Sequence, residues 1–186
     1  YGIDDSYQKI LVGPTSAAAD MANHGINLVS LANNHSDDAG LDGFKTTRAA
    51  LDSAGIIHSG TSVNHDPFEP AIINIKNKNV LFFSVTFKRN FGKDWGNSEE
   101  YRKPVAYIEN ITEFAYFLNK LSVYRQIYPD AFIICSVHWG EQYKSQVEVW
   151  QEVFAQEMVE SGANCVLGHH PHVLRKFEYY KDALIF

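Results

Sequence analysis

Three apolar runs in this sequence each end in asparagine or histidine side chains. Residues 28–32 lead to Asn34 and His35, residues 132–137 lead to His138, and residues 165–167 lead to His169, His170 and His172. Such a run is typical of a buried strand, and strand ends in α/β proteins commonly present ligand-binding groups. We therefore expect these polar side chains to meet at one edge of a sheet.

The side chains at these strand ends suit a metal site. Imidazole nitrogens and carboxamide oxygens are good ligands for divalent first-row metals, and a site needs several of them from different strands. We predict that the metal is held by Asn34, His138, His170 and His172. Because side chains alternate along a strand, His170 and His172 would serve one site, or two neighbouring ones, only from a turn. The alternative is that these histidines merely cap or pack.

The neighbours of the predicted ligands suggest supporting roles. His35 directly follows Asn34, so an extended backbone would not point both at one metal, and a general acid is the better interpretation. Asp38, or its neighbour Asp37, would orient His35. Glu141, three residues after His138, would orient His138 or bind substrate. For His169 three roles are open: a metal ligand, a residue that supports a ligand, or an ordinary loop residue. For each acidic residue the alternative is a solvated loop charge.

The composition limits the class of function. The chain has 186 residues, 45% hydrophobic and 20% charged, which suits one domain with a sizeable core. Its net charge of −6, with scattered Lys and Arg, argues against nucleic acid as a partner. An anionic substrate stays possible because a bound metal reverses the local field. A serine-hydrolase elbow and the glycine motifs of nucleotide-binding loops are absent from the sequence.

The periodicity of apolar residues predicts alternating helices and strands, hence an α/β fold with a mixed sheet covered by helices. Helices are expected between Thr15 and Gly25 and over residues 43–54, 111–128 and 146–161; strands are expected over residues 26–32, 56–59, 71–75, 80–85, 131–137, 164–167, 173–174 and 183–186. Asp42 is expected to cap the second helix. The side chains expected to face inward from the last helix are those of Val149, Val153, Phe154 and Val159.

Further predictions concern the two cysteines, a long insertion and three aromatic residues. Cys135 and Cys165 lie in predicted strands and are interpreted as buried free thiols, with a disulfide as the open alternative. Residues 87–104 form an irregular insertion that suits a functional rim or a mobile segment. The aromatic residues Trp95, Trp139 and Tyr143 are candidates to line a groove.

Three segments of the sequence carry a family resemblance. Residues 30–35 with Asp38 and Gly40, residues 138–143, and residues 162–173 together resemble the bacterial poly-γ-glutamate capsule synthesis (CapA-like) family. That family looks like a branch of the calcineurin-like metallophosphoesterases. The resemblance implies a β-sandwich of mixed sheets flanked by helices, with one or two divalent ions (Mn, Fe or Zn).

The resemblance also implies roles for individual residues. Asn34, His138, His170 and His172 resemble the metal ligands of the superfamily. His35 resembles the histidine that contacts the phosphate and protonates a leaving group. The superfamily's two upstream motifs, which supply aspartate ligands, are not found in the 33 residues before Asn34. We therefore expect residues 1–186 to be a single CapA-like domain that is incomplete at both ends, a fragment of a longer chain.

The function that the resemblance implies is synthesis or export of an anionic polymer such as poly-γ-glutamate, by metal-dependent hydrolysis or transfer. Expected partners are the polymer or a phosphoester substrate and other capsule components, and the expected location is the cell envelope, in association with a membrane. Two alternatives stay open: a non-catalytic polymer-binding or assembly component, and a broad-specificity metallophosphatase.

Overall fold

A computed structural model describes residues 11–62, 64–90 and 104–186 of the chain. Helices and strands alternate along most of this length. The elements in chain order are α1 (Ser16–Asn23), β1 (Leu28–Ser30), α2 (Gly40–Ser53), β2 (Ile57–Ser59), β3 (Ala71–Ile75), β4 (Lys78–Thr86), α4 (Ile111–Ile127), β5 (Phe132–His138), α5 (Val149–Glu160), β6 (Cys165–His169), β7 (Glu178–Tyr180) and β8 (Ala183–Ile185).

The strands form one large and one small sheet. The large sheet has six strands in the order β3-β4-β5-β6-β8-β7, and β1 pairs with β2 in a separate parallel sheet. Strands β4, β5, β6 and β8 run parallel, whereas the edge strands β3 and β7 pair antiparallel with their neighbours. The prediction of an α/β fold with a mixed sheet flanked by helices is therefore confirmed.

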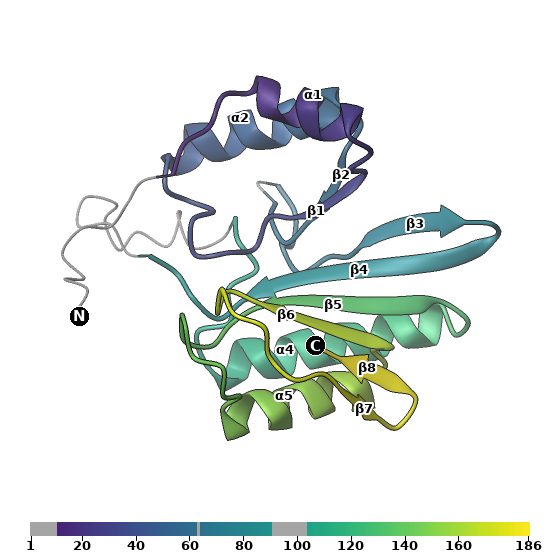
Figure 1. Cartoon of the computed structure of the whole chain (residues 1–186). Helices are drawn as coiled ribbons and strands as arrows, with labels where there is room; N and C mark the ends of the chain where they lie inside the picture. The colour runs from purple at the N-terminus through teal and green to yellow at the C-terminus, as the bar shows by residue number, and fades with distance from the viewer. Residues whose placement is uncertain (1–10, 63, 91–103) are drawn as a thin grey trace.

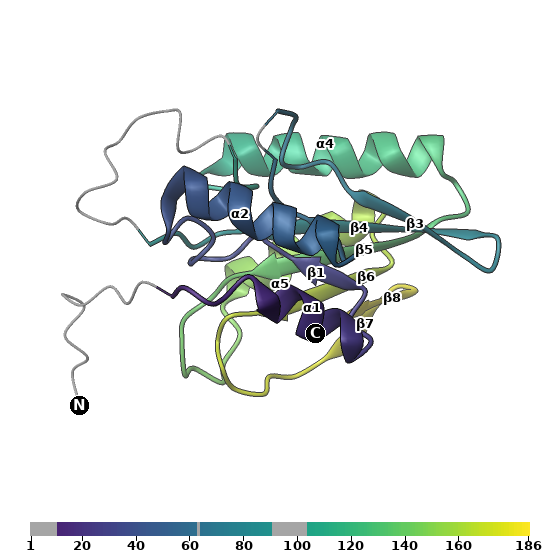
Figure 2. The same ribbon diagram turned by 90° about the horizontal axis from the view of Figure 1, so that it is seen from above.

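The elements are stacked in layers (Figure 1). Helices α4 and α5 cover one face of the large sheet, while the β1–β2 sheet lies on the opposite side and carries α1 and α2 on its outer surface. Figure 2 shows the same arrangement from above, with α2 crossing over the large sheet. The parallel strands thus end along one edge of the molecule, which is the edge where the polar side chains gather.

Alternation along the central strands builds the main core. Leu81, Phe83 and Val85 of β4 are buried in the same apolar cluster as Phe117 and Leu121 of α4. The intervening side chains of β4 face the other way. A parallel strand covered on both sides reads as a continuous apolar run, which is why the sequence predicted β4 and β5 well.

A glycine allows the small sheet to lie close to the large one. Gly60, directly after β2, has φ +95°, and a Cβ there would lie 2.7 Å from Ala32 Cβ and 2.8 Å from Ser84 Oγ. Only glycine takes this backbone conformation without strain and leaves room for both neighbours. The close approach holds the end of β1, and hence Asn34, over the end of the large sheet.

The predicted cap of α2 is wrong. Asp42 does not cap this helix, which begins at Gly40, and Ala39 at the N-cap makes no side-chain hydrogen bond. Gly40 adopts φ +68° and its amide bonds to Asp37 O, so the chain turns into the helix three residues earlier than expected. Asp42 instead lies in the first turn, where a carboxylate interacts favourably with the helix dipole.

The predicted inward face of α5 is also wrong in part. Val149 and Val153 are exposed, whereas Phe154 and Val159 are partly buried against the core as predicted. The fully buried side chains are those of Gln151, Ala155 and Met158. A capping box between Glu148 and Gln151 sets the start of the helix and turns residues 151, 155 and 158 toward the sheet. The sequence pattern missed this because a polar residue, Gln151, occupies the buried face.

The C-terminal strands differ from the prediction. Val173 and Leu174 form a loop and not a strand, because β6 ends at His169 and the chain then turns through His170 and His172, whose φ angles are +101° and +58°. The strand before the predicted turn is β7, and Lys181 in that turn has φ +51°. The predicted strand over residues 26–32 is shorter than expected, since only β1 pairs with β2.

The predicted hairpin and the two predicted free cysteines are both present in the structure. The β3–β4 hairpin is confirmed, and Cys135 and Cys165 are buried free thiols on the neighbouring strands β5 and β6. Most of the insertion predicted over residues 87–104, with Trp95, lies outside the described residues. Across the described part of the chain, no helix combines the length and apolar character that crossing a bilayer requires.

Candidate functional site

The site forms where β1, β4, β5 and β6 end. Asn34, just beyond β1, and His138, the last residue of β5, are 104 positions apart in sequence, yet Asn34 Oδ1 lies 2.9 Å from His138 Nε2. Both side chains are buried. The structure therefore brings together two of the residues that the sequence predicted to act on one metal.

His35 is held by a carboxylate. His35 Nδ1 lies 2.7 Å from Asp38 Oδ2, which also accepts a hydrogen bond from the Leu11 amide at 2.8 Å. A carboxylate only accepts, so Nδ1–H of His35 donates and Nε2 is left for other contacts. The side chain of Asp38 is 8% exposed and that of His35 is 30% exposed. The imidazole of His35 is therefore partly exposed, and its contact with Asp38 sets its orientation.

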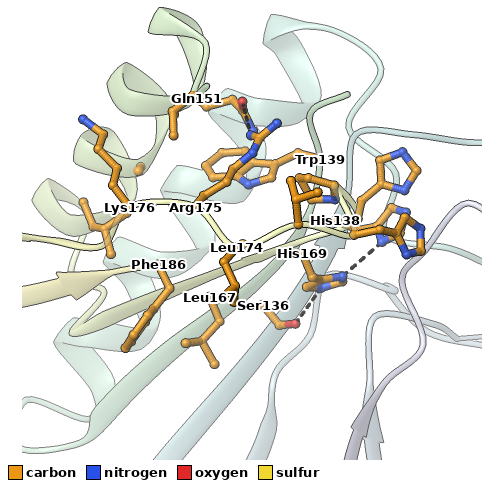
Figure 3. A pocket seen from close by; sticks show the side chains of 18 of the residues that line it. Ser136, His138, Trp139, Gln151, Leu167, His169, Leu174, Arg175, Lys176 and Phe186 are labelled. Atoms are coloured by element: carbon orange, nitrogen blue, oxygen red, sulfur yellow. Dashed lines mark hydrogen bonds between the residues drawn. The ribbon is translucent and has the colours of Figure 1, made fainter. Parts of the chain in front are cut away.

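His169 forms a hydrogen-bonded row with two β5 residues (Figure 3). Ser136 Oγ lies 3.0 Å from His169 Nε2, and His169 Nδ1 lies 3.0 Å from His138 Nδ1. His138 and His169 are register partners across β5 and β6, and Ser136 precedes His138 by two positions on the same face. Ser136 was not among the residues predicted for the site, although the two-residue period of a strand places it on the same face as His138.

His170 and His172 lie in a turn after β6. Their φ angles are +101° and +58°, so the backbone leaves the extended conformation at both positions. The His170 ring lies 4.4 Å from the His138 ring and 5.9 Å from the His172 ring, measured between centroids. Backbone strain of this kind is often found at functional sites. The turn places the His170 ring beside His138 and the His172 ring beside His170, which a regular strand would not allow.

Burial keeps the central imidazoles neutral. Burial, together with the neighbouring histidines, lowers the pKa of His138 to about 3, and burial with His172 and Lys88 nearby lowers the pKa of His170 to about 4. Burial also lowers the pKa of His169. At neutral pH these rings therefore offer lone pairs rather than positive charge, which is the state that ligates metals.

The segment after β4, residues 87–90, contacts both β5 and the loop after β1. The Phe87 amide donates to His138 O at 2.9 Å, and Arg89 binds Asp37 with a nitrogen–oxygen distance of 2.5 Å. The Asn90 side chain accepts a hydrogen bond from Asn34 Nδ2 at 3.1 Å. This segment was predicted to be part of an irregular insertion and was assigned no role in the site. Its position directly after a buried strand was the signal that could have identified it.

Glu141 pairs with a lysine of the same segment. Lys88 Nζ donates to Glu141 Oε1 at 2.9 Å, and this contact lowers the pKa of Glu141. Both side chains are more than a third exposed, so the pair lies at the rim of the site and water screens it. The predicted contact between Glu141 and His138 is not among the hydrogen bonds of the described residues, and Glu141 instead places a charged pair beside the histidines.

A cavity of about 1000 Å³ adjoins the histidines (Figure 3). Its wall is partly apolar, with Leu167, Leu174 and Phe186, and partly basic, with Arg175. Trp139, predicted to line a groove, belongs to this wall but is itself buried. Tyr143 is exposed, and its ring centroid lies 5.8 Å from that of His172.

The residues present fit a divalent metal in their chemistry. His170 Nδ1 is buried without a hydrogen-bond partner, which costs free energy unless a ligand supplies one. The imidazoles of His138, His170 and His172 and the Asn34 oxygen supply donors of the right type. Within the described ranges, however, no three His, Cys, Asp or Glu side chains are gathered closely enough to hold an ion. A bound metal therefore needs further ligands or a closer approach of these donors.

Comparison with known proteins gives consistent matches. A family model described as bacterial capsule synthesis protein PGA_cap matches residues 3–186. The capsule biosynthesis protein CapA of Bacillus anthracis is 30% identical over 162 residues, covering 87% of this chain and 38% of that protein. The PGA biosynthesis protein CapA of Bacillus subtilis strain 168 is 25% identical, covering 86% of this chain and 40% of that protein. The chain thus spans about two fifths of the length of these relatives.

Proposed function

Because the chain belongs to the bacterial capsule synthesis protein family PGA_cap, we propose that its histidine cluster is a metal-dependent phosphoesterase-type site. This site would act in the synthesis or export of an anionic polymer such as poly-γ-glutamate. The observation that carries the proposal is the contact between Asn34 and His138, two donors from distant strands that meet beside neutral imidazoles. A common ligand-binding role at the C-terminal ends of the strands explains this convergence better than separate packing roles do.

The names of the relatives favour the same biological role. One is called a capsule biosynthesis protein and the other a PGA biosynthesis protein. Other capsule components would be its partners, and the cell envelope, close to a membrane, its location. Nucleic acid is not a partner that this proposal includes, because the net charge of the chain is −6.

In this proposal Asn34, His138, His170 and His172 hold one or two divalent ions, with Mn, Fe and Zn as candidates. A divalent ion in such a site polarises a phosphoryl or carbonyl oxygen and activates water. Ser136 and His169 fix the ring of His138 from behind. The orphaned Nδ1 of His170 gains a partner when the site is loaded.

His35 is the proton donor of the proposed reaction. Its Nδ1–H donates to Asp38, so Nε2 is the atom that would carry the transferred proton, and the doubly protonated ring is the form that would donate it. Its side chain is partly exposed, which gives a leaving-group oxygen access to that atom. Lys88, at the rim beside Glu141, supplies positive charge for an anionic substrate.

Metal content tests the metal part of the proposal. The purified protein, prepared without chelator, should contain Mn, Fe or Zn by elemental mass spectrometry, and His170→Ala should reduce that content. His24→Ala is the control, because His24 is exposed and its Nδ1 contacts only Asp20 O of its own helix among the described hydrogen bonds. Unchanged metal content in the His170→Ala protein would refute the assigned ligands.

Turnover tests the catalytic part. The metal-loaded protein should hydrolyse a phosphodiester with an alkoxide leaving group, and His35→Ala should lower kcat by about 10²–10⁴-fold, because such a leaving group needs the general acid. The metal content of this variant should stay as in the wild type, since His35 is not assigned as a ligand.

A non-catalytic, polymer-binding component is the second candidate. It is favoured by the absence, among the described residues, of a group of three or more His, Cys, Asp or Glu side chains arranged around one point. The two candidates differ in the behaviour of His35→Ala in cells. Normal capsule production by this variant, together with no phosphodiester turnover by the wild type, would favour the binding component.

A further inference from the structure

Asn90 touches two key residues of the site, and none of the roles above accounts for it. Its backbone amide donates to Asn34 O at 3.2 Å, and its Oδ1 accepts from Asn34 Nδ2 at 3.1 Å. Its own Nδ2 lies 3.3 Å from His35 Nδ1, which is a close approach and not a hydrogen bond, because His35 Nδ1–H already donates to Asp38. One side chain thus contacts both the predicted metal-ligand asparagine and the predicted general acid.

The contact matters because a carboxamide has two different ends. Rotation by half a turn exchanges the oxygen and the NH₂ group of Asn34, and its Oδ1 would then no longer face His138. Asn34 is buried, so whichever group faces Asn90 must find a matching partner there. The oxygen of Asn90 matches only the NH₂ group of Asn34, and this pairing directs Asn34 Oδ1 toward His138 Nε2.

We propose that Asn90 is a positioning residue that fixes the orientation of the Asn34 carboxamide. The use of the oriented oxygen as a metal ligand rests on the proposed function, but the orientation itself does not. A carboxamide oxygen only accepts, so His138 Nε2 must carry the proton while its Nδ1 accepts from His169. Asn90 therefore also sets the tautomer of His138, two side chains away.

The backbone around Asn90 is held independently of its side chain. The buried side chain of Arg89 binds Asp37, Lys88 binds Glu141, and the Phe87 amide bonds to His138 O. Truncation of Asn90 therefore removes the amide pairing without releasing the segment. This makes Asn90 suitable for substitution, because the fold does not depend on it.

The test compares three variants by NMR at one pH, without metal. In the wild type, long-range ¹H–¹⁵N spectra should show the His138 proton on Nε2. Asn90→Ala should give a mixture of the two tautomers, because Asn34 is free to turn over. Asn90→Asp keeps an oxygen that accepts from Asn34 Nδ2, so it should preserve the wild-type tautomer. Asn79→Ala, in the exposed β3–β4 hairpin where Asn79 accepts from Asn74, is the control and should change nothing.

A wild-type tautomer pattern in Asn90→Ala would overturn the proposal, and so would a mixture in Asn90→Asp as large as that in Asn90→Ala. Titration with Mn²⁺ adds a second readout: Asn90→Ala should bind Mn²⁺ about 10- to 100-fold more weakly, and Asn90→Asp should restore binding. Equal Mn²⁺ affinity of Asn90→Ala and wild type would contradict the link to the metal. If the wild type binds no Mn²⁺ at all, the proposed function fails, while the tautomer measurement still decides the role of Asn90.

Discussion

At the scale of single residues, the pair of His35 and Asp38 gives the sharpest prediction. Asp38 fixes the ring through Nδ1, so Asp38→Ala should leave His35 free to rotate and to adopt the wrong tautomer. We expect kcat for a phosphodiester to fall by about 10- to 100-fold, as is typical when the hydrogen-bond partner of an active-site histidine is lost.

The chain offers a matched control for this substitution. His58 Nε2 lies 3.0 Å from Asp52 Oδ1, which is a second histidine–aspartate pair away from the strand-end site. Asp52→Ala should leave kcat unchanged. Equal losses of activity in the two variants would mean that Asp38 acts only through general stability, and the role assigned to it would be withdrawn.

The residues that the sequence identified differ in kind from those it missed. Asn34, His35, His138 and His170 attract attention because imidazole and carboxamide groups directly after apolar runs are uncommon. Asn90 and Ser136 do not, because isolated asparagines and serines are frequent in loops and strands. The role of Ser136 comes from the register of β5 with β6, and that of Asn90 from the contact between the segment after β4 and the end of β1; both depend on the tertiary structure rather than on the local sequence.

At the scale of elements, α4 is joined to the loop after β2 by an ion cluster. Lys120 Nζ lies 2.6 Å from Asp66 Oδ2 and also binds Glu69. Burial alone would raise the pKa of Asp66, but hydrogen bonds from Lys120 and Tyr116 outweigh it and hold the pKa below its usual value of 3.8. The ionised carboxylate is therefore more stable in the folded than in the unfolded protein.

Removal of this lysine should destabilise the fold in a pH-dependent way. Lys120→Met leaves Asp66 and Glu69 without their cation, and we expect a loss of about 1–2 kcal/mol in the free energy of unfolding at pH 7. The contribution of Asp66 is fully present above its unfolded pKa and is lost as the pH falls through its lower folded pKa. The difference between variant and wild type should therefore shrink below about pH 4.

Urea unfolding at pH 7 and at acid pH checks this expectation. Lys181→Met is the matched control, since Lys181 pairs with Glu160 at an exposed position and should contribute nothing measurable. A difference between Lys120→Met and wild type that stays constant down to acid pH would show that Lys120 contributes by packing its aliphatic stem rather than by its charge.

Helices and strands could be predicted where their buried residues are apolar, and less well where polar residues are buried. The runs that form β4, β5 and β6 are apolar because both faces of the central sheet are covered. The inward face of α5 was assigned wrongly because Gln151 is buried there and bonds to Arg175. The strands β1 and β7 are only three residues long, and so short a sequence pattern does not show where a strand begins or ends.

At the scale of the whole molecule, the layered arrangement brings residues from separate parts of the sequence together in one site. Parallel strands bring their C-terminal ends to one edge, and the small sheet adds the end of β1 above them (Figure 1). The sequence indicated this convergence because three strand ends carry similar groups. It did not indicate that Gly60 sets the distance between the sheets, since a glycine in a loop has many explanations.

The charge of the whole chain gives the last prediction. With a net charge of −6, the protein repels an anionic polymer at long range, while Lys88 and Arg175 beside the histidines attract it locally. The Debye length falls from about 30 Å at 0.01 M salt to about 8 Å at 0.15 M, so salt screens the distant repulsion more than the local contacts. We expect association of the 186-residue chain with poly-γ-glutamate to become about two- to tenfold faster over this range. Stopped-flow or surface-binding kinetics measure this rate, and polylysine, whose association should slow with salt, is the control. Slower association of poly-γ-glutamate at higher salt would mean that local positive charge governs the encounter, contrary to this argument.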